Sequence, residues 1–228
     1  MGIELREVRL GGPRSELLPT LSVVAAEQAL TVIAVDTDER PMLLSLLLAG
    51  RLKPSAGEVL IDGRADPREL RRRVALVDTP YTAEPDPGVP VRTVVAEELS
   101  FAGHSAHGPS AHGLSVDAVL EQVGVSVGPR VPIRELPTTQ RLRLLCTLAL
   151  LREGVDTLVI TSPERHGGNP RELLAELDAI VSAGRTAIVV TDAATTSALE
   201  AARAERPGRE HAPNPVPPPP SMEAQANS

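Results

Sequence analysis

A short apolar run, an acidic turn and a leucine-rich segment form the part of the chain whose residue types bear most directly on chemistry. Residues 31–35 have the length and β-branching of a buried strand. Pro41 opens a segment typical of a helix, and Gly50 and Pro54 mark its end. A strand, a tight turn and a helix in this order can present backbone N–H groups to a phosphate.

The turn lacks the groups that a phosphate site requires. Such a loop needs glycines that let N–H groups approach the anion, a lysine on the outer phosphates and a hydroxyl on magnesium. Pro41 offers no N–H, and Met42 cannot bind magnesium. At about 4 Å, each carboxylate repels a phosphate charge by roughly 1 kcal/mol in water and about 4 kcal/mol near a protein surface. The pattern G-x-x-x-x-G-K-[ST] is replaced by Val35, Asp36, Thr37, Asp38, Glu39, Arg40, Pro41 and Met42.

These residues also suit a structural turn. Asp38 could cap the helix, and Pro41 fits the first helical turn. We favour this structural interpretation. An acidic metal site and residual nucleotide binding are the alternatives for the same turn.

The composition limits the classes of function. The chain has 228 residues and a net charge of −7, and 42% of its residues are hydrophobic, so one large α/β domain can bury a sizeable core. Aromatic residues make up only 1%, namely Tyr81 and Phe101, so the core must be aliphatic. The negative charge and the lack of stacking platforms argue against binding to nucleic acid.

Cysteine and histidine usage gives two weaker signals. Cys146 lies in a helical-looking apolar run, where a buried core thiol is favoured over a nucleophile, and a single cysteine suits a reducing cytoplasm. His104, His107 and His112 could hold a metal, but a polar loop is favoured because no acidic or cysteine residue keeps a regular spacing with them. The sequence shows neither a signal-peptide pattern nor an apolar run of membrane-spanning length. A role at a membrane would therefore depend on a partner.

Apolar strands alternate with helical segments, which predicts an α/β fold with a parallel sheet. The Pro-rich residues 207–228 predict a disordered or polyproline tail, for which docking to a partner is an alternative role. We expect strands at 3–10 (an edge strand), 17–25, 31–35, 57–63, 74–77, 157–160 and 186–190. We expect helices at 41–50, 66–73, 91–101, 116–123, 141–151, 170–182 and 193–206.

Two segments carry a resemblance to a known family. Residues 43–63, LLSLLLAGRLKPSAGEVLIDG, closely resemble the ATP-binding subunit of ABC transporters. Residues 135–143 resemble the signature of that family, L-S-G-G-Q followed by a basic helix. Leu136, Gln140 and Arg143 match it, whereas Pro137, Thr138 and Thr139 replace the serine and the two glycines. Threonine side chains block the backbone approach that the glycines allow.

The resemblance covers roughly residues 3–202 and implies a P-loop-NTPase-like ABC cassette. This fold has a parallel sheet flanked by helices, an antiparallel β edge and a helical subdomain, here at about 91–155 within a domain of residues 1–206. The family activity would be ATP hydrolysis coupled to transport, with ATP and magnesium as cofactors. The partners implied are a membrane permease, another ABC ATPase subunit or both, in a homo- or heterodimer.

The catalytic positions of the family are all altered. The magnesium-binding Asp and the catalytic Glu correspond to Thr161 and Ser162, and a sensing histidine corresponds to Asp192. Residues 78–81 stand where the family has a magnesium-contacting glutamine, and they contain no glutamine. We therefore predict a catalytically inactive subunit with no catalytic residue, no cofactor and no metal. It would act in the cytoplasm by binding a partner, at the inner face of the membrane if that partner is a permease. The alternatives are a divergent subunit that still couples ATP hydrolysis to transport, and a soluble scaffold or regulator.

Overall fold

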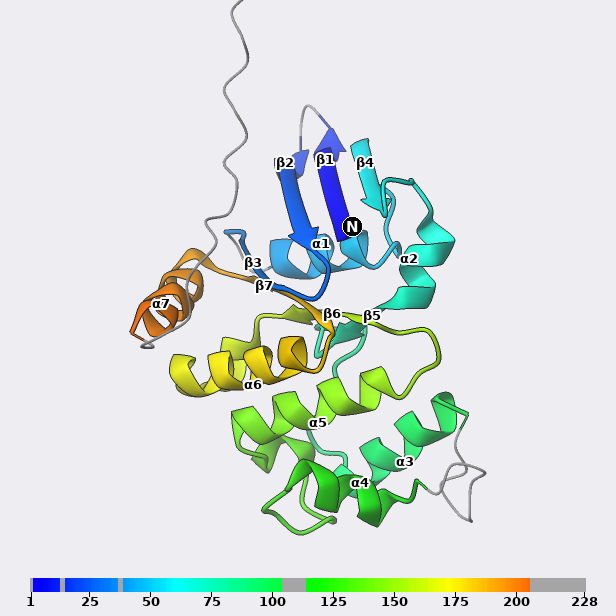
Figure 1. The fold of residues 1–228 in the computed structure, drawn as a ribbon, viewed down its shortest axis with the longest axis vertical. Coiled ribbons are helices and arrows are strands. Elements are labelled where there is room, and N and C mark those ends of the chain that lie inside the picture. Colours follow the sequence, from blue (N-terminus) through cyan, green and yellow to red (C-terminus); the bar gives the residue numbers. More distant parts are fainter. Residues whose placement is uncertain (1, 13–14, 37–38, 104–113, 206–228) are drawn as a thin grey trace, which may run out of the picture.

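The computed structural model of the chain describes residues 2–12, 15–36, 39–103 and 114–205 (Figure 1). The predicted histidine loop and the Pro-rich tail lie outside these ranges. The strands are β1 (Gly2–Gly12), β2 (Ser15–Ala26), β3 (Leu30–Ala34), β4 (Ala56–Ile61), β5 (Val74–Val77), β6 (Thr157–Thr161) and β7 (Thr186–Thr191). The helices are α1 (Arg40–Leu48), α2 (Pro67–Arg73), α3 (Val91–Phe101), α4 (Val116–Val123), α5 (Thr138–Leu150), α6 (Pro170–Ser182) and α7 (Ala193–Ala204), with 3₁₀ turns η1 (Ile133–Glu135) and η2 (Pro163–His166).

The central sheet is parallel, as the alternation of strands and helices predicts. Its strand order is β3-β7-β6-β5. Its strands are apolar runs because both faces are covered. Alternate residues of one strand enter different cores: Leu158 and Ile160 face α5 and α6, whereas Val159 faces α1 and the second sheet. The predicted α/β fold class is therefore confirmed.

The second sheet is antiparallel and has the order β2-β1-β4 (Figure 1). The expectation that residues 3–10 form an edge strand is wrong, because β1 pairs with β2 on one side and with β4 on the other. Ile3, Leu5 and Val8 are buried, so the N–H and C=O groups of this strand need hydrogen-bond partners on both sides. β4 ends in the expected Asp-Gly turn, in which Asp62 and Gly63 both have positive φ.

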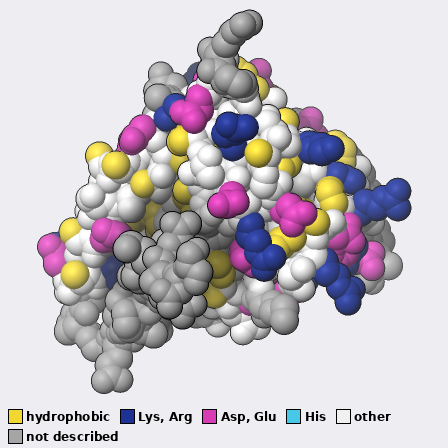
Figure 2. Space-filling view, turned by 90° about the horizontal axis from the view of Figure 1, so that it is seen from above, with side chains coloured by type: hydrophobic (Ala, Val, Ile, Leu, Met, Phe, Trp, Pro, Cys, Tyr) yellow, Lys and Arg dark blue, Asp and Glu magenta, His cyan; other side chains and the backbone are white. Residues whose placement is uncertain are grey.

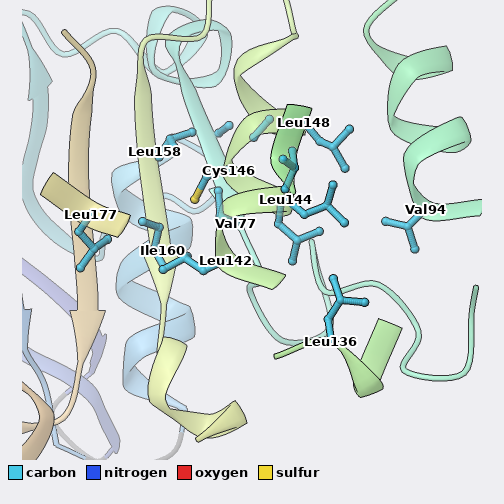
Figure 3. Packing of buried hydrophobic residues seen from close by; sticks show 14 of the residues in the cluster. Val77, Val94, Leu136, Leu142, Leu144, Cys146, Leu148, Leu158, Ile160 and Leu177 are labelled. Carbon is cyan, nitrogen blue, oxygen red and sulfur yellow. The ribbon is translucent and has the colours of Figure 1, made fainter. Parts of the chain in front are cut away.

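The two sides of the parallel sheet differ in what covers them. Helix α1 and the antiparallel sheet cover one side, and helices α3 to α7 pack on the other (Figure 1). Cys146 of α5 lies between this helix and the sheet, beside Val77 and Leu158 (Figure 3). Burial raises the pKa of the Cys146 thiol far above its ordinary value, so the predicted core role of this residue is confirmed.

Charges are mixed on the end of the molecule that carries the antiparallel sheet, where acidic and basic side chains are interspersed (Figure 2). Among the described residues, none of the helices combines the length and the hydropathy needed to cross a bilayer.

Candidate functional site

The carboxyl ends of the parallel strands bring the predicted site positions to one edge of the sheet. The N–H of Val35 donates to the carbonyl of Thr191 (2.9 Å), which joins the end of β3 to the end of β7. The N–H of Ser162 donates to the carbonyl of Val190 (2.9 Å), which joins the end of β6 to β7. Val35, Ser162 and Asp192 therefore lie along the same edge, where α1 begins.

Helix α1 begins at Arg40, and its N-cap is Glu39, whose side chain makes no capping hydrogen bond. Asp38, which the sequence proposed as the cap, lies outside the described residues. The Nε of Arg40 donates to the carbonyl of Leu17 in β2 (3.0 Å), so this cation contacts the antiparallel sheet. Pro41 is buried in the first turn. The exposed acidic residue Asp36 follows β3.

Three buried hydroxyl groups form a chain beneath the start of α1. Thr79 Oγ1 lies 2.8 Å from Thr161 Oγ1, and Thr161 Oγ1 lies 2.8 Å from Ser45 Oγ. Ser45 Oγ lies 2.8 Å from the carbonyl oxygen of Pro41. All three hydroxyl residues are at most 1% exposed. Thr161, which the sequence comparison set against a magnesium-binding Asp, thus bonds to Thr79 and Ser45.

The last acceptor of this hydroxyl chain, the carbonyl oxygen of Pro41, sets the direction of each hydrogen bond in it. A carbonyl oxygen can only accept, so Ser45 donates to Pro41. Ser45 must then accept from Thr161, and Thr161 must accept from Thr79, because each hydroxyl has one proton. Each of the three protons therefore has an acceptor within the protein.

These residues do not fit a magnesium nucleotide. Magnesium is usually held by carboxylates and by phosphate oxygens. Thr161 and Ser162 offer hydroxyls in place of carboxylates, and Thr161 Oγ1 already accepts a hydrogen bond from Thr79. The absent N–H of Pro41 and the charges of Asp36 and Glu39 oppose a phosphate at the same helix start. We therefore derive no catalytic step through a nucleotide.

A buried ion-pair cluster is the strongest electrostatic feature that the sequence did not reveal. Asp78 follows β5, and Arg141 lies in the first turns of α5. Arg141 donates to both carboxylate oxygens of Asp78, from Nε (2.9 Å) and from NH2 (2.7 Å). Their side chains are only 4% and 7% exposed, respectively. Such a bidentate pair fixes the end of β5 against α5.

Residues of η2 complete this cluster. Arg165 lies 3.0 Å from Asp78 Oδ1 and pairs with Glu84 (2.9 Å). His166 Nε2 lies 2.9 Å from Asp78 Oδ2. Burial alone would raise the pKa of Asp78, but the hydrogen bonds and the charge of Arg141, together with the charge of Arg165, hold that pKa well below its ordinary value. Asp78 is therefore ionised at neutral pH.

Three side chains of this cluster carry atoms that could ligate a metal. Such atoms of Asp78, Glu84 and His166 lie within 4.8 Å of one another. Arg165 is paired with both carboxylates, so a cation at their centre would meet a guanidinium group. The donor set thus suits an arginine better than a divalent metal. The other metal candidates, His104, His107 and His112, lie outside the described residues.

A signal for the ion pair was present in the sequence. Arg141 is spaced from Leu144, Leu145 and Leu148 by three, four and seven residues, which places it on the apolar face of α5. An arginine on a buried face requires an anionic partner. Asp78, which directly follows a predicted buried strand, was a candidate for this anionic partner of Arg141.

The remnants of the signature serve contacts within the chain. Leu136 is buried in the core beneath α5. Gln140 accepts a hydrogen bond from the N–H of Ser126 (2.9 Å), and Arg143 pairs with Glu176 of α6. Thr138 Oγ1 donates to the carbonyl of His166 (2.7 Å), which joins the start of α5 to η2.

Asp192, which the sequence comparison set against a sensing histidine, is the N-cap of α7. Its carboxylate accepts a hydrogen bond from the N–H of Thr195 (2.6 Å). This bond satisfies one of the free N–H groups at the helix start, which is a structural role. An acidic residue directly before a predicted helix is the sequence signal for such a cap.

The parallel sheet, the attached antiparallel sheet and the helices inserted between β5 and β6 define an ATP-binding-cassette fold. A solved structure of cbiO1 from Clostridium perfringens, part of the ABC transporter complex cbiONQ, shares it with a TM-score of 0.60 and 18% identity, over 83% of this chain and 78% of that one. An ATP-binding subunit of an ABC transporter matches with a TM-score of 0.57 and 15% identity, over 86% and 82%. A putative ABC transporter ATP-binding protein from Pyrococcus furiosus matches with a TM-score of 0.58 and 14% identity, over 84% and 92%.

At these low identities, the structural matches establish the fold alone. They confirm the fold that the resemblance implied. No family model matches the chain, and no curated protein sequence matches it.

Proposed function

We propose that this chain is a catalytically inactive cassette subunit that acts by binding a partner. The observation that supports this most directly is the hydroxyl chain from Thr79 through Thr161 and Ser45 to Pro41. It uses the groups at the sheet edge for bonds within the protein. Nothing in this set supplies a metal ligand of the usual kind, a general base or a phosphate clamp.

The partner is a membrane permease, an active ATPase subunit or both. The fold supports this choice, because cbiO1 of Clostridium perfringens is part of a transporter complex. Tyr81, the one tyrosine of the chain, supports a contact surface, because this residue is 98% exposed. Exposed tyrosines are enriched among the residues that dominate protein interfaces. Through a permease, the chain would lie at the cytoplasmic face of a membrane.

Titration calorimetry of the full chain with ATP and magnesium tests the inactive state. We expect no binding heat at nucleotide concentrations that saturate a competent cassette ATPase measured in the same buffer. Micromolar binding would contradict the proposal and would favour the divergent, ATP-coupled alternative. Magnesium alone and ADP alone serve as ligand controls.

A second experiment tests the partner. Affinity purification of the tagged full chain from detergent extracts of its native host should recover a multi-spanning membrane protein or a second cassette ATPase in comparable amount. Tyr81→Ser should weaken this recovery, whereas Arg68→Ser, on an exposed face of α2, should not. Recovery of the chain alone, with neither protein present, would favour the soluble scaffold.

A further inference from the structure

The loop after β5, here called the Tyr81 loop (residues 78–84), holds two residues in an unfavourable backbone conformation. The φ angles of Asp78 and Tyr81 are 53° and 59°, in the left-handed region that residues with a Cβ rarely adopt. Tyr81 is 98% exposed, so its ring gains little from burial that could offset this conformation. Such a conformation persists only where the surrounding structure holds it.

Arg165 of η2 contacts both ends of the Tyr81 loop. Its NH2 group donates to the carbonyl oxygen of Asp78 (2.5 Å) and lies 3.0 Å from Oδ1 of the same residue. Its NH1 group lies 2.9 Å from Oε2 of Glu84. The side chains of Arg165 and Glu84 are only 23% and 27% exposed, so water screens this pair less than a pair at the surface. One guanidinium group therefore joins the residue that opens the loop to the residue that closes it.

The backbone of the Tyr81 loop closes on a single acceptor. The carbonyl oxygen of Thr79 accepts hydrogen bonds from the N–H groups of Thr82 (3.2 Å), Ala83 (2.9 Å) and Glu84 (3.0 Å). A carbonyl oxygen has two lone pairs, so these three donors share it, and the turn gains less than three full hydrogen bonds. The ion pair of Glu84 with Arg165 adds a link that the backbone of the turn does not supply.

The role of Arg165 is separable from the buried ion pair beside it. When Arg165 is replaced, Arg141 still makes both hydrogen bonds to the Asp78 carboxylate, so β5 remains joined to α5. What is lost is the pair with Glu84 and the hydrogen bond to the Asp78 carbonyl oxygen.

We propose that Arg165 is a positioning residue for the partner contact at Tyr81. It holds the Tyr81 loop in one conformation, so the ring is presented to the partner before binding. The inference rests on the proposed function, because it takes Tyr81 as part of the contact surface. A loop that is already ordered loses less conformational freedom when it binds, which increases affinity.

Hydrogen exchange of the full chain, followed by mass spectrometry, tests whether Arg165 holds the loop. In Arg165→Gln, residues 82–84 should exchange about tenfold faster or more, because hydrogen bonds to a charged group are lost. Peptides from α5 and β6 should keep their native rates. Arg171→Gln is the matched control, because it removes an arginine from a surface pair with Glu205 and should leave exchange at residues 82–84 unchanged.

Tyr81 provides a second readout, since the chain contains one tyrosine and no tryptophan. The decay of the fluorescence anisotropy therefore reports the motion of this residue alone. In Arg165→Gln, the amplitude of its fast local motion should rise, whereas Arg171→Gln should match the native protein. Thermal unfolding of each variant checks the fold.

Affinity purification of the partner connects the loop to binding. Arg165→Gln should reduce recovery of the partner, and Arg165→Gln combined with Tyr81→Ser should lose no more than Tyr81→Ser alone. Losses that do not add are expected of two residues that act as a unit. A purely structural effect of Arg165 would instead add to the loss of the Tyr81 ring.

Three results would overturn the proposal. They are native exchange rates at residues 82–84 in folded Arg165→Gln, native recovery of the partner by that variant, and additive losses in the double variant. The exchange and anisotropy measurements require neither a partner nor a nucleotide. If the native chain recovers no partner while the loop of Arg165→Gln loosens as expected, the proposed function and its Tyr81 contact fail, and the hold of Arg165 on the loop is confirmed.

Discussion

Arg141→Met should be among the most destabilising single substitutions in this chain. Methionine keeps the apolar stem of the side chain but removes both hydrogen bonds to Asp78. Because the Asp78 side chain is only 7% exposed, its charge is left in the interior with Arg165 as the nearest remaining guanidinium. Removing one partner of a buried ion pair costs about 3–5 kcal/mol. For a domain of this size, that corresponds to a decrease in Tm of roughly 6–20 °C.

Arg143→Met is the matched control, because it lies on the same helix and also removes an arginine from an ion pair. The Arg143 side chain is 44% exposed, although Glu176 is only 14% exposed and NH1 of Arg143 also donates to the carbonyl of Val123 (3.1 Å). Because water reaches this pair, its loss should cost about 1–2 kcal/mol, less than the loss of the buried pair. Chemical denaturation of both variants at neutral pH measures the difference. If Arg141→Met costs no more than Arg143→Met, the assignment of Asp78 and Arg141 as a buried pair is wrong.

The pH dependence provides an independent check on the same pair. The folded-state pKa of Asp78 is lowered from its ordinary value of 3.8, so the pair contributes fully above that pH and loses its contribution as the pH falls toward the folded-state value. In Arg141→Met, burial is opposed by fewer charges, so the pKa of Asp78 lies above that of the native protein. The stability difference between the two proteins should therefore stay constant near neutral pH and shrink in the acid range, once the pH falls below the Asp78 pKa of the variant. A constant difference would show that Asp78 is not the group affected.

Three further pairs of substitutions test other parts of the structure by chemical denaturation. Thr161→Val should cost about 1–3 kcal/mol of stability, because it interrupts the hydroxyl chain. Thr191→Val should be neutral or stabilising, because the buried Thr191 hydroxyl has no partner among the described residues. Equal costs for the two variants would contradict the hydrogen bonds assigned to Thr161. Asp192→Ala should cost about 1 kcal/mol by removing the cap of α7, and Asp192→Asn should cost little; an equal loss would exclude capping as the cause. The exposed Tyr81 has a φ of 59°, in the left-handed region that glycine adopts easily and a residue with a Cβ does not. Tyr81→Val should therefore cost about 1 kcal/mol more stability than Tyr81→Gly. Equal stabilities would mean that this backbone conformation is not strained.

The sequence predicted the elements of the fold well but not all of their pairings. The apolar runs of β5, β6 and β7 are long enough and sufficiently β-branched to be recognised as buried strands. The position of β1 in the middle of its sheet could not be read in the same way. Alternation reports which face of a strand is buried, but it does not report how many neighbours the strand has.

The polar interior was harder to predict because its partners are distant in sequence. Thr79 and Thr161 are separated by 82 residues, and Thr161 and Ser45 by 116. Each residue alone resembles an ordinary strand-end or helix residue. The hydroxyl chain becomes visible only when the parallel strands place their carboxyl ends beside α1. The replacements at Thr161 and Asp192 were visible from the resemblance, but the contacts that these residues make were not.

The polar groups at the sheet edge are matched to one another. Buried polar groups need partners, and each unmet one costs free energy. Here Thr161 donates to Ser45, and Asp78 is matched by Arg141. Introducing a single carboxylate would break this matching. In Thr161→Asp, for example, the carboxylate would keep Thr79 as a donor, but Ser45 could donate to it only by giving up its hydrogen bond to Pro41. That variant should lose stability without gaining magnesium binding, because an active site would need several coordinated changes.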